Sequence, residues 1–153
     1  MTDMQKKETA RVVLEQYSRY TTKISMLNDT ASDLTRRNEF LLHKGVRLSA
    51  RTQQHHREIM NELQRMIDQY ERNRQSIIAV IESITESTKF ERGCRECLMM
   101  RYVEDMTQEQ MLERMSISHE HLMRKRGRAL LLFYDAMEAA KPAGIEPPAD
   151  DED

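Results

Sequence analysis

The stretch from Met106 to Met137 constrains the fold of this chain more than any other segment. Its first part predicts a short helix, because Thr107 can act as the N-cap and Gln110 follows at the spacing of a capping box. The apolar residues of this segment lie on one helical face: Met111, Leu112 and Met115. The sequence therefore predicts a capped, amphipathic helix that begins directly after Thr107.

Residues 116–118 separate this helix from the next periodic segment. Ser118 is a good N-cap, because its hydroxyl can accept a hydrogen bond from a free backbone N–H of the following turn. Ile117 is the natural apolar contact between the two helices. So short a connection makes the helices cross steeply, and this predicts a helix-turn-helix.

The second helix is expected from about residue 119 to about residue 140, with an inward apolar face. That face comprises Leu122, Ala129, Leu130, Phe133 and Met137. The outward face of its first half is predicted to hold His119, Glu120, His121, Arg124, Lys125 and Arg128. With Arg126, the four cations against Glu120 give this segment a net charge of +3, whereas the whole chain carries −2. A local basic stripe on an acidic protein is typical of a helix that enters a DNA groove.

The helix-turn-helix geometry predicts separate roles for these residues. The first turns of such a helix read base edges, and later turns lie near phosphates. We expect His119, Glu120, His121 and Arg124 to read base edges, with Arg124 suited to guanine and Glu120 to cytosine. Ser118, the N-cap, is counted with them among the DNA-binding residues. The phosphate candidates are Lys125, Arg126 and Arg128. The alternative is an ordinary solvated basic face, which charge alone favours; the cap, the short turn and the apolar spacing together favour DNA reading.

The run from Leu98 to Leu130 resembles region 4 of bacterial sigma-70-type factors. The matching segments are Arg101-Tyr102, the capping turn from Thr107 to Met111, the turn from Met115 to Ser118, then Leu122 and Arg128-Ala129-Leu130. With long helices ahead of it, the chain looks most like the ArpU/RinA-type late-gene regulators of Gram-positive phages and integrated elements. The resemblance implies double-stranded DNA as a ligand, and RNA polymerase as a further partner. The chain departs from the pattern at Ser116, where Gly is usual, and at Lys125, where an apolar residue is common.

Composition favours extended helices over a large globular core, because 33% of residues are charged and 5% are aromatic. A helix is expected over residues 5–27, where a heptad seam runs through Val13, Tyr17, Tyr20, Ile24 and Leu27. A break is expected at residues 28–30, followed by a helix over 32–43 that ends at Gly45. The two helices would precede the longest element of the chain.

That longest helix is expected over residues 51–84. Its seam is predicted to run through Ile59, Leu63, Met66, Tyr70, Asn73, Ile77, Val80 or Ile81, and Ile84. Asn73 either fixes the register and oligomeric state of a coiled coil or lies where the seam drifts to solvent. The two seams either pack on each other as a hairpin or build a homodimer.

Two elements are expected between the longest helix and the helix-turn-helix. They are a polar connector over residues 85–93 and a helix over residues 91–102. Residues 141–153 contain all three prolines, and five acids against one lysine give them a net charge of −4. This composition predicts a disordered acidic tail.

The sequence offers no pattern that favours an enzyme, a metal site or a cofactor. Cys94 and Cys97 have a CxxC spacing, but His119 and His121 point about 200° apart on a helix (two steps of about 100°) and cannot complete a zinc site with them. No apolar run is long enough to cross a bilayer, and no signal-peptide core follows the amino terminus. We therefore expect a cytoplasmic protein without membrane contact, and the resemblance implies that the cytoplasm is that of a bacterial host cell.

The sequence thus predicts an all-α protein with long coiled-coil-like N-terminal helices and a C-terminal helix-turn-helix. The expected divisions are an oligomerisation arm (1–88), a DNA-binding domain (89–140) and the tail (141–153). The expected function is sequence-specific transcriptional regulation by a dimer that docks residues 119–128 in the major groove. The resemblance implies that it activates phage or mobile-element genes. The alternatives are a phage DNA-packaging recognition subunit, and a sigma-like module that binds RNA polymerase without reading DNA.

Overall fold

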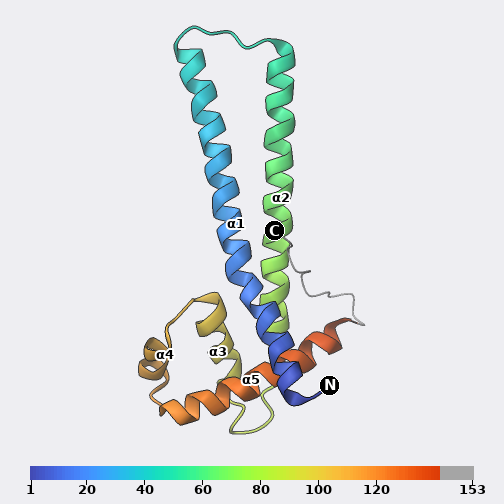
Figure 1. The fold of residues 1–153 in the computed structure, drawn as a ribbon, viewed down its shortest axis with the longest axis vertical. Helices are drawn as coiled ribbons and strands as arrows, with labels where there is room; N and C mark the ends of the chain where they lie inside the picture. The colour runs from blue at the N-terminus through green and yellow to red at the C-terminus, as the bar shows by residue number, and fades with distance from the viewer. Residues whose placement is uncertain (142–153) are drawn as a thin grey trace. The chain divides into compact units, whose positions relative to one another are not determined.

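The computed structural model describes residues 1–141, and these residues form helices and connecting turns without any β-strand (Figure 1). The elements are α1 (Asp3–His43), α2 (Ala50–Glu82), α3 (Cys94–Leu98), the π-helix η1 (Met99–Val103), α4 (Gln108–Met115) and α5 (His119–Ala140). The predicted all-α class is confirmed. Apart from Lys141, the predicted acidic tail lies outside the described residues.

Helix α1 is continuous, so the predicted break at residues 28–30 and the separate helices on either side of it are wrong. The polar residues stay within the helical hydrogen-bond pattern, since the Thr30 hydroxyl donates to the Met26 carbonyl oxygen at 3.0 Å. Asn, Asp and Thr are only modestly weaker helix formers than other residues, so three in succession do not end a long helix. The spacing of half-buried residues also continues across this point, at Leu27, Ala31 and Leu34.

The end of α1 follows the prediction at Gly45. Its φ of 80° lies in the left-handed region that favours glycine. The N–H of Val46 donates to the Leu41 carbonyl at 2.9 Å, and that of Gly45 donates to the Leu42 carbonyl at 3.0 Å, which is a Schellman motif. Helix α2 then begins after Ser49, whose hydroxyl accepts a hydrogen bond from the Thr52 N–H at 3.1 Å.

The chain divides into two compact units. Among the described residues, unit 1 comprises Met1–Arg19 together with residues 73–141, and unit 2 comprises Tyr20–Arg72. This differs from the predicted boundary between residues 88 and 89, because the first turns of α1 and the last turns of α2 belong to the unit that contains α4 and α5. Ala10 and Leu14 of α1 are completely buried in unit 1, as are Ile77 and Ile81 of α2.

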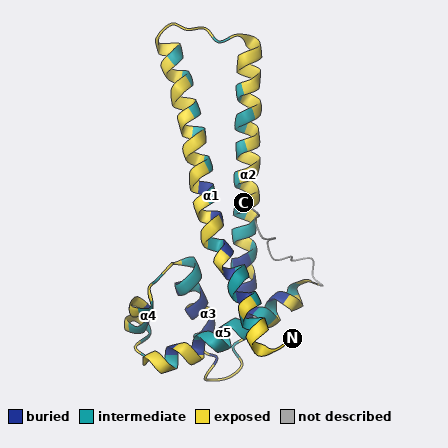
Figure 2. Ribbon diagram, viewed as in Figure 1, coloured by how far each residue is buried: buried dark blue, intermediate teal, exposed yellow. Residues whose placement is uncertain are grey.

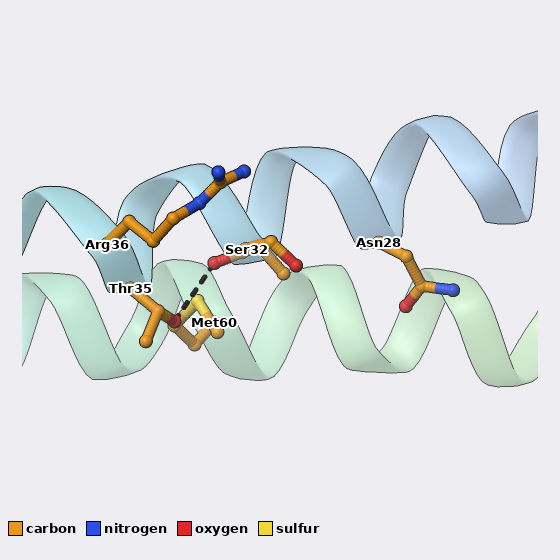
Figure 3. Close-up of a pocket in the computed structure, with 6 residues that line it drawn as sticks. Asn28, Ser32, Thr35, Arg36 and Met60 are labelled. Atoms are coloured by element: carbon orange, nitrogen blue, oxygen red, sulfur yellow. Dashed lines mark hydrogen bonds between the residues drawn. The ribbon is translucent and has the colours of Figure 1, made fainter.

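Unit 2 is a hairpin of two helical segments joined by residues 44–49 (Figure 1). The rings of Tyr20 and Tyr70 lie 5.7 Å apart, so the hairpin alternative for the two seams is realised within this unit. Tyr20 and Ile24 are its only buried residues, and Figure 2 shows the hairpin helices mainly exposed. Small and polar residues partly explain this: Figure 3 shows Ser32 and Thr35 of α1 beside Met60 of α2, in an open pocket.

The seam of α2 differs from the prediction at one position. Met66 is 37% exposed, whereas its neighbour Ile67 is half-buried. The helical repeat therefore runs from Leu63 through Ile67 to Tyr70, in steps of 4 and 3. Asn73, at the start of the unit 1 part of α2, is half-buried.

The core of unit 1 combines the ends of α1 and α2 with α3, η1 and α5. Its largest completely buried side chains include Leu14, Ile77, Ile81, Leu98, Met100 and Phe133. Ala10 and Leu14 were missed by the heptad prediction, which chose the half-buried Val13 and Tyr17 instead. None of the helices in the described residues is both long and apolar enough to cross a membrane.

Candidate nucleic-acid interface

The predicted capping box of α4 is confirmed. The Thr107 hydroxyl accepts a hydrogen bond from the Gln110 N–H at 3.2 Å, and the Thr107 N–H donates to Oε1 of Gln110 at 2.9 Å. This reciprocal pair satisfies two N–H groups that an isolated helix end would leave free. Helix α4 therefore begins at the residue that its sequence specifies.

The turn between α4 and α5 also follows the prediction. Ser116 has a φ of 54° and donates its N–H to the Leu112 carbonyl at 3.0 Å, so serine here adopts the left-handed conformation in which glycine is usual. The Ser118 hydroxyl accepts a hydrogen bond from the His121 N–H at 3.1 Å and caps α5. The expected succession of short helix, three-residue turn and long helix is present.

A small apolar cluster holds this segment together. Cys97, Met100, Met111 and Leu122 are buried in it, at 1% exposure or less. Ile117 and Met115 pack against the cluster with partly buried side chains. The prediction that Ile117 fills the space between the two helices is thus confirmed.

The segment that precedes α4 differs from the predicted single helix over residues 91–102. Helix α3 begins only at Cys94, because Gly93 has a φ of 91° and residues 89–93 form turns. The helix then widens into η1, where the Glu104 N–H donates to the Met99 carbonyl at 2.8 Å, five residues back. Phe90, Glu91 and Arg92 are therefore turn residues.

The first two turns of α5 present part of the predicted base-reading set to solvent. His119, Glu120 and Arg124 are exposed, and so is Ser118. Met123 adds an apolar side chain that is 46% exposed on the same stretch. His121 is half-buried, because its ring stacks on Phe90 with centroids 6.2 Å apart and an interplanar angle of 14°.

The prediction that Lys125 lies on the outward face is wrong, because its side chain is only 6% exposed. Its Nζ donates to the carbonyl oxygens of Phe90 and Arg92, at 3.2 and 2.6 Å. Leu122 and Ala129, which flank Lys125 on the helix, are completely buried, so the helical repeat directs Lys125 inward. Its ammonium group is bound to the turn that contains Phe90 and Arg92, and it is not available to a phosphate.

Arg128 is also engaged within the protein. Its Nε donates to Oε2 of Glu91 at 2.7 Å, and its Nη2 contacts the same oxygen. The Arg128 side chain stays 42% exposed, whereas that of Glu91 is 6% exposed. Arg126 is half-buried, and its Nη1 contacts Sδ of Met123 at 3.8 Å. Of the three predicted phosphate residues, Arg126 and Arg128 therefore stay partly accessible, whereas Lys125 does not.

The Glu91–Arg128 pair predicts how stability depends on pH. Hydrogen bonding to Arg128 holds the pKa of Glu91 below its ordinary value, despite the opposing effect of burial. A lowered pKa stabilises the fold above the ordinary glutamate pKa of about 4.3, and this contribution is lost as the pH falls through the lower, folded-state value. In chemical unfolding from pH 7 to pH 3, we expect the wild type to lose more stability than Glu91→Gln. Equal losses in both proteins would contradict the role of the pair.

Two residues near α5 escaped prediction because they are distant in sequence. The Nζ of Lys7 in α1 would lie 3.1 Å from a Cβ added at Gly127 of α5. The Nζ of Lys6 lies 5.7 Å from the ring centre of Tyr134, also on α5. Both cations come from the segment predicted as an oligomerisation arm, and nothing in the local pattern of α1 indicates this contact.

The surroundings of the two cysteines favour a structural role. Cys94 and Cys97 are free and buried, and burial raises the pKa of both thiols, that of Cys97 to about 11. A protonated, buried thiol is a poor nucleophile and a poor metal ligand. No group of three or more potential His, Cys, Asp or Glu metal ligands occurs within residues 1–141.

Comparison of the chain with protein-family models, with curated proteins and with solved structures found no match in any of the three.

Proposed function

We propose that this protein is a sequence-specific, double-stranded DNA-binding transcriptional regulator that docks the first turns of α5 in the major groove. The observation that carries the proposal is the combination of a capped α4, a left-handed Ser116 and a capped α5 whose first turns expose His119, Glu120 and Arg124. This arrangement presents the side chains of a helix amino terminus on a small, well-packed support, as a major-groove reader requires.

The proposed contacts follow the structure rather than the charge count alone. Arg124 is the candidate for a bidentate contact to guanine, and Glu120 for a contact to cytosine. Arg126 and the exposed part of Arg128 are the phosphate candidates on α5. Lys125 leaves this set because its ammonium group is bound to two carbonyl oxygens.

We further propose that the active species is a homodimer that reads a repeated or palindromic site. Exposed apolar side chains of unit 2, among them Met26, Phe40 and Leu42, provide surface for such pairing. RNA polymerase is the second partner in this proposal, since an activator acts by contacting it, and the bacterial cytoplasm is the compartment in which both partners occur.

The test begins with selection from a random DNA pool by the purified full chain, at near-physiological salt. Arg124→Ala is then expected to lose about 1–3 kcal/mol of binding free energy on the selected site, about 5- to 150-fold in affinity, and to relax preference at one base position. Arg51→Ala is the matched control, because Arg51 is an exposed arginine of unit 2. An equal loss on selected and random DNA, or no loss, would contradict the assignment.

The assembly state separates this proposal from the DNA-packaging alternative. A regulator is expected as a dimer by solution mass, whereas a packaging subunit forms a closed ring of many copies. Binding of Arg124→Ala to RNA polymerase with wild-type affinity, together with loss of regulation, would argue against a module that only contacts polymerase.

A further inference from the structure

The turn of residues 88–92, between α2 and α3, is fixed to the amino-terminal half of α5. Lys125 bonds to two of its carbonyl oxygens, those of Phe90 and Arg92, at 3.2 and 2.6 Å. Two acceptors from one short turn on the same ammonium group leave that turn little freedom to move along the helix.

Side chains of the turn provide further attachment. The Phe90 ring stacks on His121, and Glu91 forms an ion pair with Arg128. The turn is also bonded internally, since the Glu91 N–H donates to the Thr88 hydroxyl at 3.1 Å. Three residues of α5, spaced over two helical turns, thus hold one segment against a single flank of the helix.

The turn also carries two cationic side chains. Lys89 and Arg92 are exposed, and neither has an ion-pair partner among residues 1–141. Their carboxylate neighbour Glu91 is already paired with Arg128. Lys125 is buried and adds no charge to the surface here. The adjacent turn, however, exposes two positive groups, those of Lys89 and Arg92.

We infer that residues 88–92 form a second DNA-contact element, in which Lys89 and Arg92 bind backbone phosphates beside the groove that α5 enters. This inference depends on the proposed function. A helix in the major groove has a phosphate backbone along each flank, and the residues that hold the turn, His121 and Lys125, lie on a flank next to Arg124. A turn that is already rigid loses little conformational entropy on binding, so its contacts contribute without an ordering cost.

Salt dependence provides the test, because each phosphate contact contributes about 0.9 to the slope of log affinity against log salt concentration on duplex DNA. The double variant Lys89→Ala/Arg92→Ala is expected to reduce the magnitude of that slope by about 2, on selected and random duplexes alike. Its preferred sequence in the random pool should stay the same, since phosphate contacts carry no base information. The exchange Lys89→Arg/Arg92→Lys should keep the wild-type slope.

The matched control is Arg47→Ala/Arg51→Ala, which removes two exposed positive charges from unit 2. An equal fall in slope for this control would show that the effect comes from the net charge of the protein, and it would overturn the inference. An unchanged slope in Lys89→Ala/Arg92→Ala, with the selected motif retained, would overturn the second contact element and leave the proposed function standing. Absence of any selected motif for the wild type would overturn the proposed function itself.

Discussion

Replacement of Leu122 by alanine is expected to lower the free energy of unfolding by about 2–5 kcal/mol. Leu122 is completely buried and lies in one cluster with Cys97, Met100 and Met111. These residues come from α3, η1, α4 and α5, so the cavity would open at the point where all four elements meet. Chemical unfolding monitored by circular dichroism measures the loss.

The adjacent Met123 gives a matched control. It is 46% exposed on the same helical turn, so Met123→Ala is expected to change stability by no more than about 0.5 kcal/mol. Similar losses from both substitutions would show that the helix rotation described for α5 is incorrect, because an outward Leu122 would not leave a cavity.

Replacement of Lys125 by methionine is expected to cost about 2–4 kcal/mol of stability, because two carbonyl oxygens lose their donor in a partly buried setting. Methionine keeps the length and apolar stem of lysine, so the loss reports the hydrogen bonds and not a cavity. The same unfolding measurement applies, with Arg124→Met as the control, since Arg124 is the exposed neighbour.

If Lys125 instead faced DNA, Lys125→Met would leave stability unchanged and weaken binding to all sequences. In the structure, the Lys125 ammonium group bonds to two carbonyl oxygens of the protein instead. A stable Lys125→Met variant with a reduced salt slope would restore Lys125 to the phosphate set and remove the anchor of the 88–92 turn.

The cations of α5 differ in whether they are exposed or engaged within the protein. A basic helix segment can expose its charges to solvent or use them inside the protein, and α5 does both. Arg124 faces solvent, Lys125 is buried and Arg128 pairs with Glu91. In the proposed complex, the cations that face DNA therefore include residues outside α5, among them Lys89 and Arg92 and, near Gly127, Lys7.

The sequence by itself determined the parts that depend on near neighbours along the chain. The capping box at Thr107, the cap at Ser118 and the Gly45 helix end each involve residues within five positions of one another. The bounds of α5 were predictable for the same reason, since a cap and a 3.6-residue apolar repeat are local signals.

Only the tertiary structure decided which side chains of those elements remain available. Lys125 contacts residues 33 and 35 positions away, and Arg128 contacts one 37 positions away. The assignment of Met1–Arg19 to the unit of α5 spans an even longer separation. The physical reason is that a lysine on a helix has the same local preferences whether it meets water or two carbonyl oxygens, so its role depends on which distant backbone packs against that face.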